Sequence, residues 1–255
     1  MQIQDFAAKF GSDTIPWRLF VPKDAGRDYC VLWLQGWTSS MDSHREGVAR
    51  IAQQTTLPFA TLDYAGHGLH QTPLEDSTRK QQLEEVIAVF DELTARGYQK
   101  IIAIGGSFGA YMAALLTAQR PVQAVILRAP ANYVDNEFQL PHRETASYKD
   151  PAAWIGAKVS DPELLNGSAV EAITSFEGFV YVLEHELDHD VPARLPQTYF
   201  AAAKKGNYFI IPHTGHSPKL MPNPEKHFAY IEHVVGAILK AIQLQDNLSR
   251  NQIGS

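Results

Sequence analysis

The chain has 255 residues, of which 45% are hydrophobic and 20% are charged, and its formal net charge is -6. The length suffices for one large domain with a sizeable core, and the composition argues against long disordered stretches. The acidic balance, without a basic stripe, argues against a nucleic-acid partner. No apolar run reaches the length of a membrane span, so we expect no membrane partner.

The chain contains a single cysteine, Cys30, in the apolar stretch 29–34. An intramolecular disulfide is therefore impossible, and a buried, inert thiol is expected. The first residues contain neither the basic segment nor the apolar segment of a secretory leader. We therefore expect a cytoplasmic protein.

Apolar, β-rich runs alternate along the chain with helical patterns, which predicts parallel βαβ units in a single α/β domain over residues 1–255. Gly97 is the expected C-cap of the second predicted helix, and the polar tail 245–255 is expected to be frayed. Strands are predicted over 14–21, 29–34, 58–62, 101–104, 122–127, 179–183 and 208–211. Helices are predicted over 45–54, 82–96, 110–120, 169–175, 192–204 and 225–243.

The alternation stops after the predicted strand 122–127. Residues 131–168 contain no strong strand and are rich in Pro, Asn, Asp and aromatic residues. A long stretch without a strand inside an α/β domain often covers an active site. We therefore predict a cap insertion at about 131–175.

The pentapeptide Gly105-Gly106-Ser107-Phe108-Gly109 joins the predicted strand 101–104 to the helix that follows. A G-x-S-x-G sequence in this context predicts a strained turn that exposes the serine hydroxyl, with Gly105 and Gly109 where a Cβ would clash. The first amides of the helix favour the negative charge of an acyl-transfer intermediate. Ser107 is therefore the predicted nucleophile, and the alternative is a serine that only caps the helix.

A serine hydroxyl needs a base at neutral pH. The loop after the last predicted strand offers His213 and His216, and the glycine before His216 would let the loop turn that imidazole toward Ser107. His216 is the predicted base, with His213 as the second choice.

The base in turn needs an orienting acid, and the loop after the predicted strand 179–183 contains four. Asp188 is the predicted acid. Glu184 is expected inside the strand, and Asp190 is expected at the start of the next helix.

The same loop contains His185-Glu186-Leu187-Asp188-His189, which spells the H-E-x-x-H zinc motif. That motif binds zinc because a helix places both histidines on one face. Here a β-branched run precedes the motif and a proline follows it closely, so a helix is disfavoured. A zinc hydrolase using His185 and His189 is an unlikely alternative, and we predict no metal and no cofactor.

An oxyanion needs two backbone donors. The amide of Phe108 lies at the predicted helix start, directly after the nucleophile. The second donor should come from the loop after an early strand, where Gly36 permits close approach and Trp37 supplies the amide. The alternative is a plain glycine turn at the strand end.

These motifs together resemble those of the α/β-hydrolase superfamily, over nearly the whole chain from about Thr14 to Gln243. The Ser107 pentapeptide matches its nucleophile elbow, and Asp188 and the Gly215-His216-Ser217 stretch match its acid and its histidine loop. The sequence Asp63-Tyr64-Ala65-Gly66-His67-Gly68 resembles the structural D-x-x-G-x-G loop that follows the fourth strand. The resemblance implies an α/β-hydrolase fold, with a mostly parallel central sheet flanked by helices and a short cap insertion.

Within the superfamily, the short cap and the Gly36-Trp37-Thr38 stretch look similar to the serine carboxylesterase and lipase-like branch. That branch includes cinnamoyl and feruloyl esterases and monoacylglycerol lipases. Gln35, His70 and His185 depart from the residues that are common there. The resemblance implies hydrolysis of carboxylic esters of small acyl or aromatic acids through an acyl-serine intermediate.

Several functional alternatives stay open at this point. The same side chains could cleave thioesters or peptides, and a non-catalytic binding protein with a hydrolase-like fold is a further possibility. Tyr133, Phe138 and Trp154 of the predicted cap are expected to bind substrate, or else to bury the cap against the body. The expected partner is a small-molecule ester, and the sequence predicts no oligomeric state.

Overall fold

The computed structural model describes residues 1–11, 13–152, 154 and 162–253. Within these residues, eight strands form one sheet in the order β1-β2-β4-β3-β5-β6-β7-β8. The β1–β2 and β2–β4 pairs are antiparallel, and all later pairs are parallel. The strands are β1 (Gln2–Phe10), β2 (Asp13–Val21), β3 (Tyr29–Leu34), β4 (Phe59–Leu62), β5 (Lys100–Gly106), β6 (Val122–Arg128), β7 (Phe179–His185) and β8 (Gly206–Ile211).

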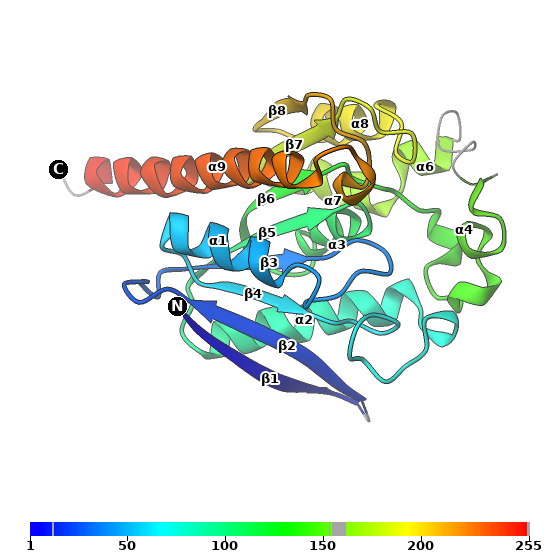
Figure 1. Ribbon diagram of the computed structural model, residues 1–255, viewed down its shortest axis with the longest axis horizontal. Coiled ribbons are helices and arrows are strands. Elements are labelled where there is room, and N and C mark those ends of the chain that lie inside the picture. The colour runs from blue at the N-terminus through cyan, green and yellow to red at the C-terminus, as the bar shows by residue number, and fades with distance from the viewer. Residues whose placement is uncertain (12, 153, 155–161, 254–255) are drawn as a thin grey trace.

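Helices cover both faces of this sheet, so its central strands are buried on both sides (Figure 1). One face carries α1 (Arg45–Thr55) and α9 (Pro224–Ile253). The opposite face carries α2 (Arg79–Ala95), α3 (Phe108–Leu116), α7 (Ser168–Ser175) and α8 (Arg194–Ala202). Within the described residues, no helix has the length and apolarity that crossing a membrane requires.

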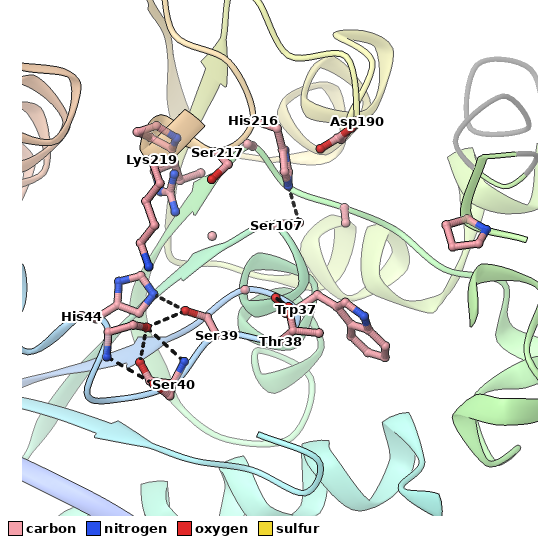
Figure 2. Close-up of a pocket in the computed structure, with 18 of the residues that line it drawn as sticks. Trp37, Thr38, Ser39, Ser40, His44, Ser107, Asp190, His216, Ser217 and Lys219 are labelled. Carbon is pink, nitrogen blue, oxygen red and sulfur yellow. Dashed lines mark hydrogen bonds between the residues drawn. The ribbon is translucent and has the colours of Figure 1, made fainter. Parts of the chain in front are cut away.

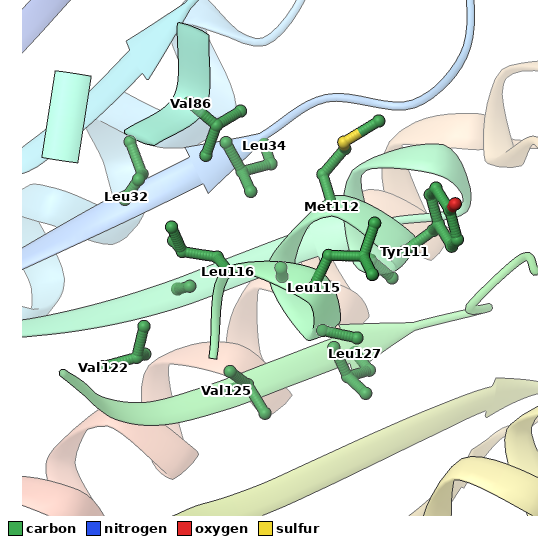
Figure 3. Close-up of a cluster of buried hydrophobic side chains, with 14 of the residues drawn as sticks. Leu32, Leu34, Val86, Tyr111, Met112, Leu115, Leu116, Val122, Val125 and Leu127 are labelled. Carbon is green, nitrogen blue, oxygen red and sulfur yellow. The ribbon is translucent and has the colours of Figure 1, made fainter. Parts of the chain in front are cut away.

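Helix α3 is buried on every side, since all nine of its residues are inaccessible to solvent or nearly so. Figure 3 shows its apolar side chains between those of β3, β6 and α2. A helix that is apolar all round belongs in a protein interior. The dense packing fixes the start of α3 rigidly against the ends of β3 and β5.

The fold class predicted from the sequence is confirmed, and most predicted elements are present within a few residues of their expected ends. Helix α2 begins three residues early because the Thr78 side chain accepts a hydrogen bond from the Gln81 amide, 3.0 Å away. Gly97 ends that helix with a φ of 94°. The prediction of a frayed tail over 245–255 is wrong for most of that segment, since α9 continues to Ile253.

The segment between β6 and α7 contains two 3₁₀ turns, Asp135–Glu137 and His142–Glu144. It also contains the short α-helices α4 (Ala146–Lys149) and α6 (Pro162–Asn166). Figure 1 shows α4 and α6 beyond the carboxyl ends of the parallel strands. Helix α7, which the predicted cap included, instead packs against α3 on the face of the sheet. Residues 153 and 155–161 of the predicted cap lie outside the described residues.

Candidate active site

Ser107 occupies a strained turn between β5 and α3, with φ 53° and ψ -114°. This region of backbone space is costly for a residue with a Cβ, and such strain persists only where the surroundings enforce it. Here the Ser107 amide donates to the Arg128 carbonyl at 2.9 Å, and the Ser107 carbonyl accepts from the Ala110 amide at 3.0 Å. The turn is therefore held from both the sheet and the helix.

The glycines on either side make this turn possible. A Cβ on Gly105 would lie 2.1 Å from the Gly109 carbonyl carbon, and one on Gly109 would lie 2.1 Å from the Leu34 carbonyl oxygen. These are backbone contacts that a side chain could not relieve. As expected from the sequence, a Cβ at either position would clash. The absence of a side chain on these glycines lets the end of β3 lie close to the start of α3.

Three distant side chains meet at this turn. The Ser107 hydroxyl and His216 Nε2 are 2.9 Å apart (Figure 2). His216 Nδ1 and Asp188 Oδ2 are 2.8 Å apart. Because a carboxylate only accepts, His216 Nδ1–H donates to Asp188 and leaves Nε2 to accept the serine proton. The structure thus joins the three side chains that the sequence analysis selected.

The second oxygen of the Asp188 carboxylate accepts the amides of Asp190 at 2.9 Å and Val191 at 2.8 Å. Burial acts to raise the pKa of Asp188, but the hydrogen bond to His216 and the two amides outweigh it and lower that pKa below its ordinary value. Glu184 lies inside β7, as expected. Asp190 lies in the loop before α8 and not at the start of that helix, which begins only at Arg194.

The loops that carry Asp188 and His216 are bonded to each other. The Leu187 amide donates to the Thr214 carbonyl at 2.9 Å, and His185 Nδ1–H donates to the Gly215 carbonyl at 2.8 Å. His185 is one of the residues that departs from the family pattern. Its position shows that it braces the turn beside His216.

His213, the second choice for the base, is 85% exposed and pairs with Glu186. The structure therefore brings His216, and not His213, to Ser107. The zinc alternative loses its geometric basis too. His185 ends a strand, donates to a carbonyl and faces Arg128, whose Nη1 lies 3.4 Å from its remaining nitrogen. A zinc ion bound to His185 Nε2 would therefore lie against the positively charged guanidinium of Arg128.

Trp37, the other predicted oxyanion donor, lies directly after Gly36 at the end of β3. Within the described residues, the main-chain N–H of Trp37 donates to no acceptor. Phe108 is the first residue of α3, where an amide has no acceptor within its own helix. Both amides flank the Ser107 turn, because a Cβ placed on Gly36 would lie 3.4 Å from the Gly106 carbonyl oxygen and 3.7 Å from Ser107 Cβ.

Side chains from the loop after β4 hold this oxyanion loop. The Thr38 amide donates to His67 Nε2 at 3.1 Å, and the Tyr64 hydroxyl donates to the Gln35 carbonyl. Burial lowers the pKa of His67 to about 4, so its imidazole is neutral and can accept the Thr38 bond. The sequence analysis did not assign this role to His67, although the residue lies in the D-x-x-G-x-G stretch.

A cavity of about 580 Å³ opens beside Ser107 and His216. Of the predicted substrate-binding residues, Tyr133 and Trp154 line it, with stacked rings 4.9 Å apart. Phe138 is not among the lining residues and packs against the core, which matches the alternative of a buried cap contact. Three basic residues also line the cavity, and none of them lies in a recognisable sequence motif: His44, Arg128 and Lys219.

A family model described as "alpha/beta hydrolase fold" matches residues 29–154 of the chain. The protein has the α/β hydrolase fold. Its expected resemblance to that superfamily is therefore confirmed. No curated protein matches the sequence closely enough to count as a relative.

Solved structures with the α/β hydrolase fold superimpose on almost the entire chain. The esterase Est1E from Butyrivibrio proteoclasticus, with ferulic acid bound, has a TM-score of 0.69 at 16% identity and covers 94% of this chain and 98% of its own. A proline iminopeptidase from Mycobacterium smegmatis has a TM-score of 0.69 at 18% identity, covering 95% and 100%. An arylesterase has a TM-score of 0.71 at 14% identity, covering 95% and 84%.

The D-x-x-G-x-G stretch has a structural role in this α/β hydrolase fold. The Asp63 carboxylate accepts the amides of Met41 at 2.8 Å and Leu69 at 2.9 Å. Gly68 has a φ of 51°, and a Cβ there would overlap that carboxylate at 2.0 Å. Asp63 thereby ties the segment after the oxyanion loop to the loop after β4.

Proposed function

We propose that this protein is a serine hydrolase that cleaves carboxylic esters. The observation that carries the proposal is the hydrogen-bonded series of Ser107, His216 and Asp188 at the mouth of a cavity. A nucleophile within reach of a base, which an acid orients in turn, is the arrangement that acyl transfer by serine requires. The α/β hydrolase fold, shared with esterases, supports the same conclusion.

In the proposed reaction, Ser107 Oγ attacks the ester carbonyl while its proton passes to His216 Nε2. Asp188 stabilises the imidazolium that forms. The amides of Trp37 and Phe108 donate to the developing oxyanion, and such donors contribute about 3 kcal/mol each to lowering the barrier.

The tetrahedral intermediate then collapses with cleavage of the bond to the alcohol. His216 returns its proton to the leaving oxygen, and the acyl group stays on Ser107 as an ester. A water molecule, deprotonated by His216, attacks that ester in the second half of the reaction. Its collapse releases the acid and restores the Ser107 hydroxyl, so no external co-reactant besides water is needed.

The leaving group is the less constrained part of this proposal. The same residues can release an alcohol, a thiol or an amine, and one of the similar structures is a peptidase. Esters are favoured because an alkoxide leaves more readily than an amide nitrogen. A parallel panel of p-nitrophenyl esters, thioesters and aminoacyl anilides ranks the three classes directly.

The decisive experiment treats the folded protein with a fluorophosphonate and maps the adduct by mass spectrometry. The proposal predicts a single phosphonylated peptide that contains Ser107, together with loss of ester turnover. Ser107→Ala should abolish both. Ser217→Ala is the matched control, since this serine lines the same cavity and should leave labelling intact. Labelling that persists in Ser107→Ala would contradict the assignment.

A further inference from the structure

The cavity beside Ser107 has two chemically different ends (Figure 2). Trp37, Tyr133 and Trp154 form the aromatic part of its lining. A second part of the lining is polar and cationic. Its side chains come from the loop after β3, from the end of β6 and from the segment after His216, and they are Ser39, Ser40, Ser43, His44, Arg128 and Lys219.

Arg128 is built into the turn of the nucleophile. A Cβ on Gly106 would lie 2.3 Å from Arg128 Nη2 and 3.0 Å from its Cζ, so the guanidinium rests against the backbone one residue before Ser107. The three atoms nearest to such a Cβ all belong to the guanidinium of Arg128. Glycine at position 106 therefore leaves the space that the guanidinium occupies.

Within the part of the chain that the structure describes, this guanidinium is not paired with a carboxylate. Among the described residues no carboxylate lies within ion-pair distance of Arg128, and its side-chain partner is the neutral His185 at 3.4 Å. Burial lowers the pKa of Arg128 to about 10, although the more distant charge of Asp188 opposes that shift. A partly buried cation without a paired anion is unfavourable, and an anionic group bound in the cavity would supply the missing charge.

Lys219 adds a second cation from the other side. In the described part of the chain it forms no ion pair, and Figure 2 shows its side chain directed toward His44. Burial lowers the pKa of His44 to about 4, and the positive charges of Arg128 and Lys219 act in the same direction. Both cations are therefore near His44, whose ring is hydrogen-bonded to Ser39 at 3.0 Å.

We propose that Arg128 and Lys219 form a subsite for an anionic group, a carboxylate or a phosphate, carried by the substrate of Ser107. This inference rests on the proposed function and narrows its substrate class to esters with one aromatic or apolar end and one anionic end. The planar guanidinium supplies paired donors to such an anion, and the lysine supplies a mobile point charge. Asp190 is the acidic member of the described lining. It lies on the opposite side of His216 from Lys219, so the positively charged part of the lining is confined to one side of the cavity (Figure 2).

The test compares matched esters. In the acyl series, p-nitrophenyl hemiglutarate and p-nitrophenyl 4-phosphonobutanoate are compared with p-nitrophenyl methyl glutarate, in which the distal charge is removed. In the alcohol series, butyryl glycolate is compared with its methylamide. The proposal predicts that kcat/KM is at least about tenfold higher for an anionic member than for its neutral counterpart in one series, as one charge-assisted contact provides. The carboxylate and phosphonate members distinguish the two kinds of anion.

Three variants locate the preference. Lys219→Gln and Arg128→Gln each remove one cation, and Gly106→Ala displaces the guanidinium without removing it. Each should lower the ratio of anionic to neutral kcat/KM by about tenfold. Lys226→Gln removes an exposed charge outside the cavity and should leave the ratio unchanged. Gly106→Ala and Lys219→Gln keep the test valid if Arg128→Gln does not fold.

A binding readout separates this inference from the proposed function. Glutarate or inorganic phosphate should raise the Tm of the Ser107→Ala protein and should not raise that of Ser107→Ala with Lys219→Gln. If neutral esters are cleaved through Ser107 but neither series prefers an anion, the subsite is refuted and the hydrolase stands. If no ester is cleaved and the anions still bind through Lys219, the subsite stands without the esterase. An absence of both effects refutes the subsite.

Discussion

Main-chain hydrogen bonds hold both the reacting centre and the segment between β6 and α7, and the segment adds an ion pair to a fully buried arginine. At the centre, main-chain bonds fix the turns, such as Ser107 to Arg128 and Leu187 to Thr214. The segment between β6 and α7 has main-chain bonds such as His142 to Ser77, together with the ion pair of Arg79 with Glu137 at 3.1 Å. Backbone bonds tolerate most changes of side chain, whereas an ion pair is lost with one residue. A single side-chain change should therefore weaken this segment without removing the main-chain bonds of the centre.

The largest expected effect is at the centre, in Asp188→Asn. The amide would favour the wrong tautomer of His216, and the change should lower kcat for ester hydrolysis by about 10⁴-fold with little loss of stability. Steady-state kinetics and thermal unfolding of the variant test this. Asp190→Asn is the matched control, because it removes another acid of the same loop while the hydrogen bond of His216 Nδ1 to Asp188 is kept. Equal losses in both variants would refute the assignment of Asp188.

Both regions contain buried histidines, which should make the free energy of unfolding depend on pH. Burial lowers the pKa of His44 and His67 to about 4, and that of His142 and His185 to about 3. These pKa values lie below the value of about 6.5 in the unfolded chain. At pH values between the folded and unfolded pKa, the unfolded chain therefore binds more protons than the folded protein. Stability is thus fully present above about pH 6.5 and is lost as pH falls toward 4.

Denaturant unfolding across this range should report an uptake of about three to four protons on unfolding near pH 5. His67→Gln should reduce that uptake by about one proton, since its Nε2 accepts the Thr38 amide only when neutral. A free energy of unfolding that is constant between pH 7 and pH 5 would contradict the neutral, buried state of these rings.

The cap contact is tested by Glu137→Ala. Arg79 is fully buried and contacts the Tyr133 ring, so loss of its partner leaves an unpaired charge beside the cavity wall. We expect a loss of about 3 kcal/mol in the free energy of unfolding, and a rise in KM that exceeds any fall in kcat. Chemical denaturation and ester kinetics measure the two effects.

The matched control is Glu177→Ala. Glu177 pairs with Lys204 on the surface, where its side chain is 75% exposed, and such exposed pairs contribute little to stability. If both variants lose the same stability, the buried pair does not hold the cap.

A loss of stability somewhat below that of Glu137→Ala is expected from Gly109→Ala at the elbow. Its Cβ would meet the Leu34 carbonyl, so β3 and α3 must separate, at a cost of about 1–3 kcal/mol in stability. Gly26→Ala is the control, because no atom lies within 4 Å of a Cβ at that position. Thermal unfolding should separate the two variants, and equal melting temperatures would contradict the close packing of the elbow.

Features that depend on local sequence could be predicted, whereas features that depend on contacts between distant segments could not. Ser107, His216 and Asp188 were found because each lies in a short motif whose backbone geometry is local. Strand β1 was missed, since most of its residues are exposed and its order depends on pairing with β2 and on Phe6 stacking against Trp17. The fold class followed from the alternation of apolar strands with helical patterns, which requires no distant contact.

Residues of the cavity wall were harder to predict, because their roles depend on contacts between distant segments. Phe138 and Trp154 both lie in the predicted cap and both pack against the core, but of the two Trp154 also lines the cavity. Arg128 lies one residue beyond the predicted strand 122–127, and no motif marks it. Only the fold shows that it rests on Gly106 beside the nucleophile.

Rapid acid quenching during turnover of a p-nitrophenyl ester, followed by peptide mass spectrometry, tests the central claim most directly. The account predicts that the peptide containing Ser107 gains the mass of the acyl group, that His216→Ala prevents this gain, and that p-nitrophenol appears in a burst of one equivalent per active site. Turnover with no acyl group on Ser107, or with the acyl group on another residue, would contradict it.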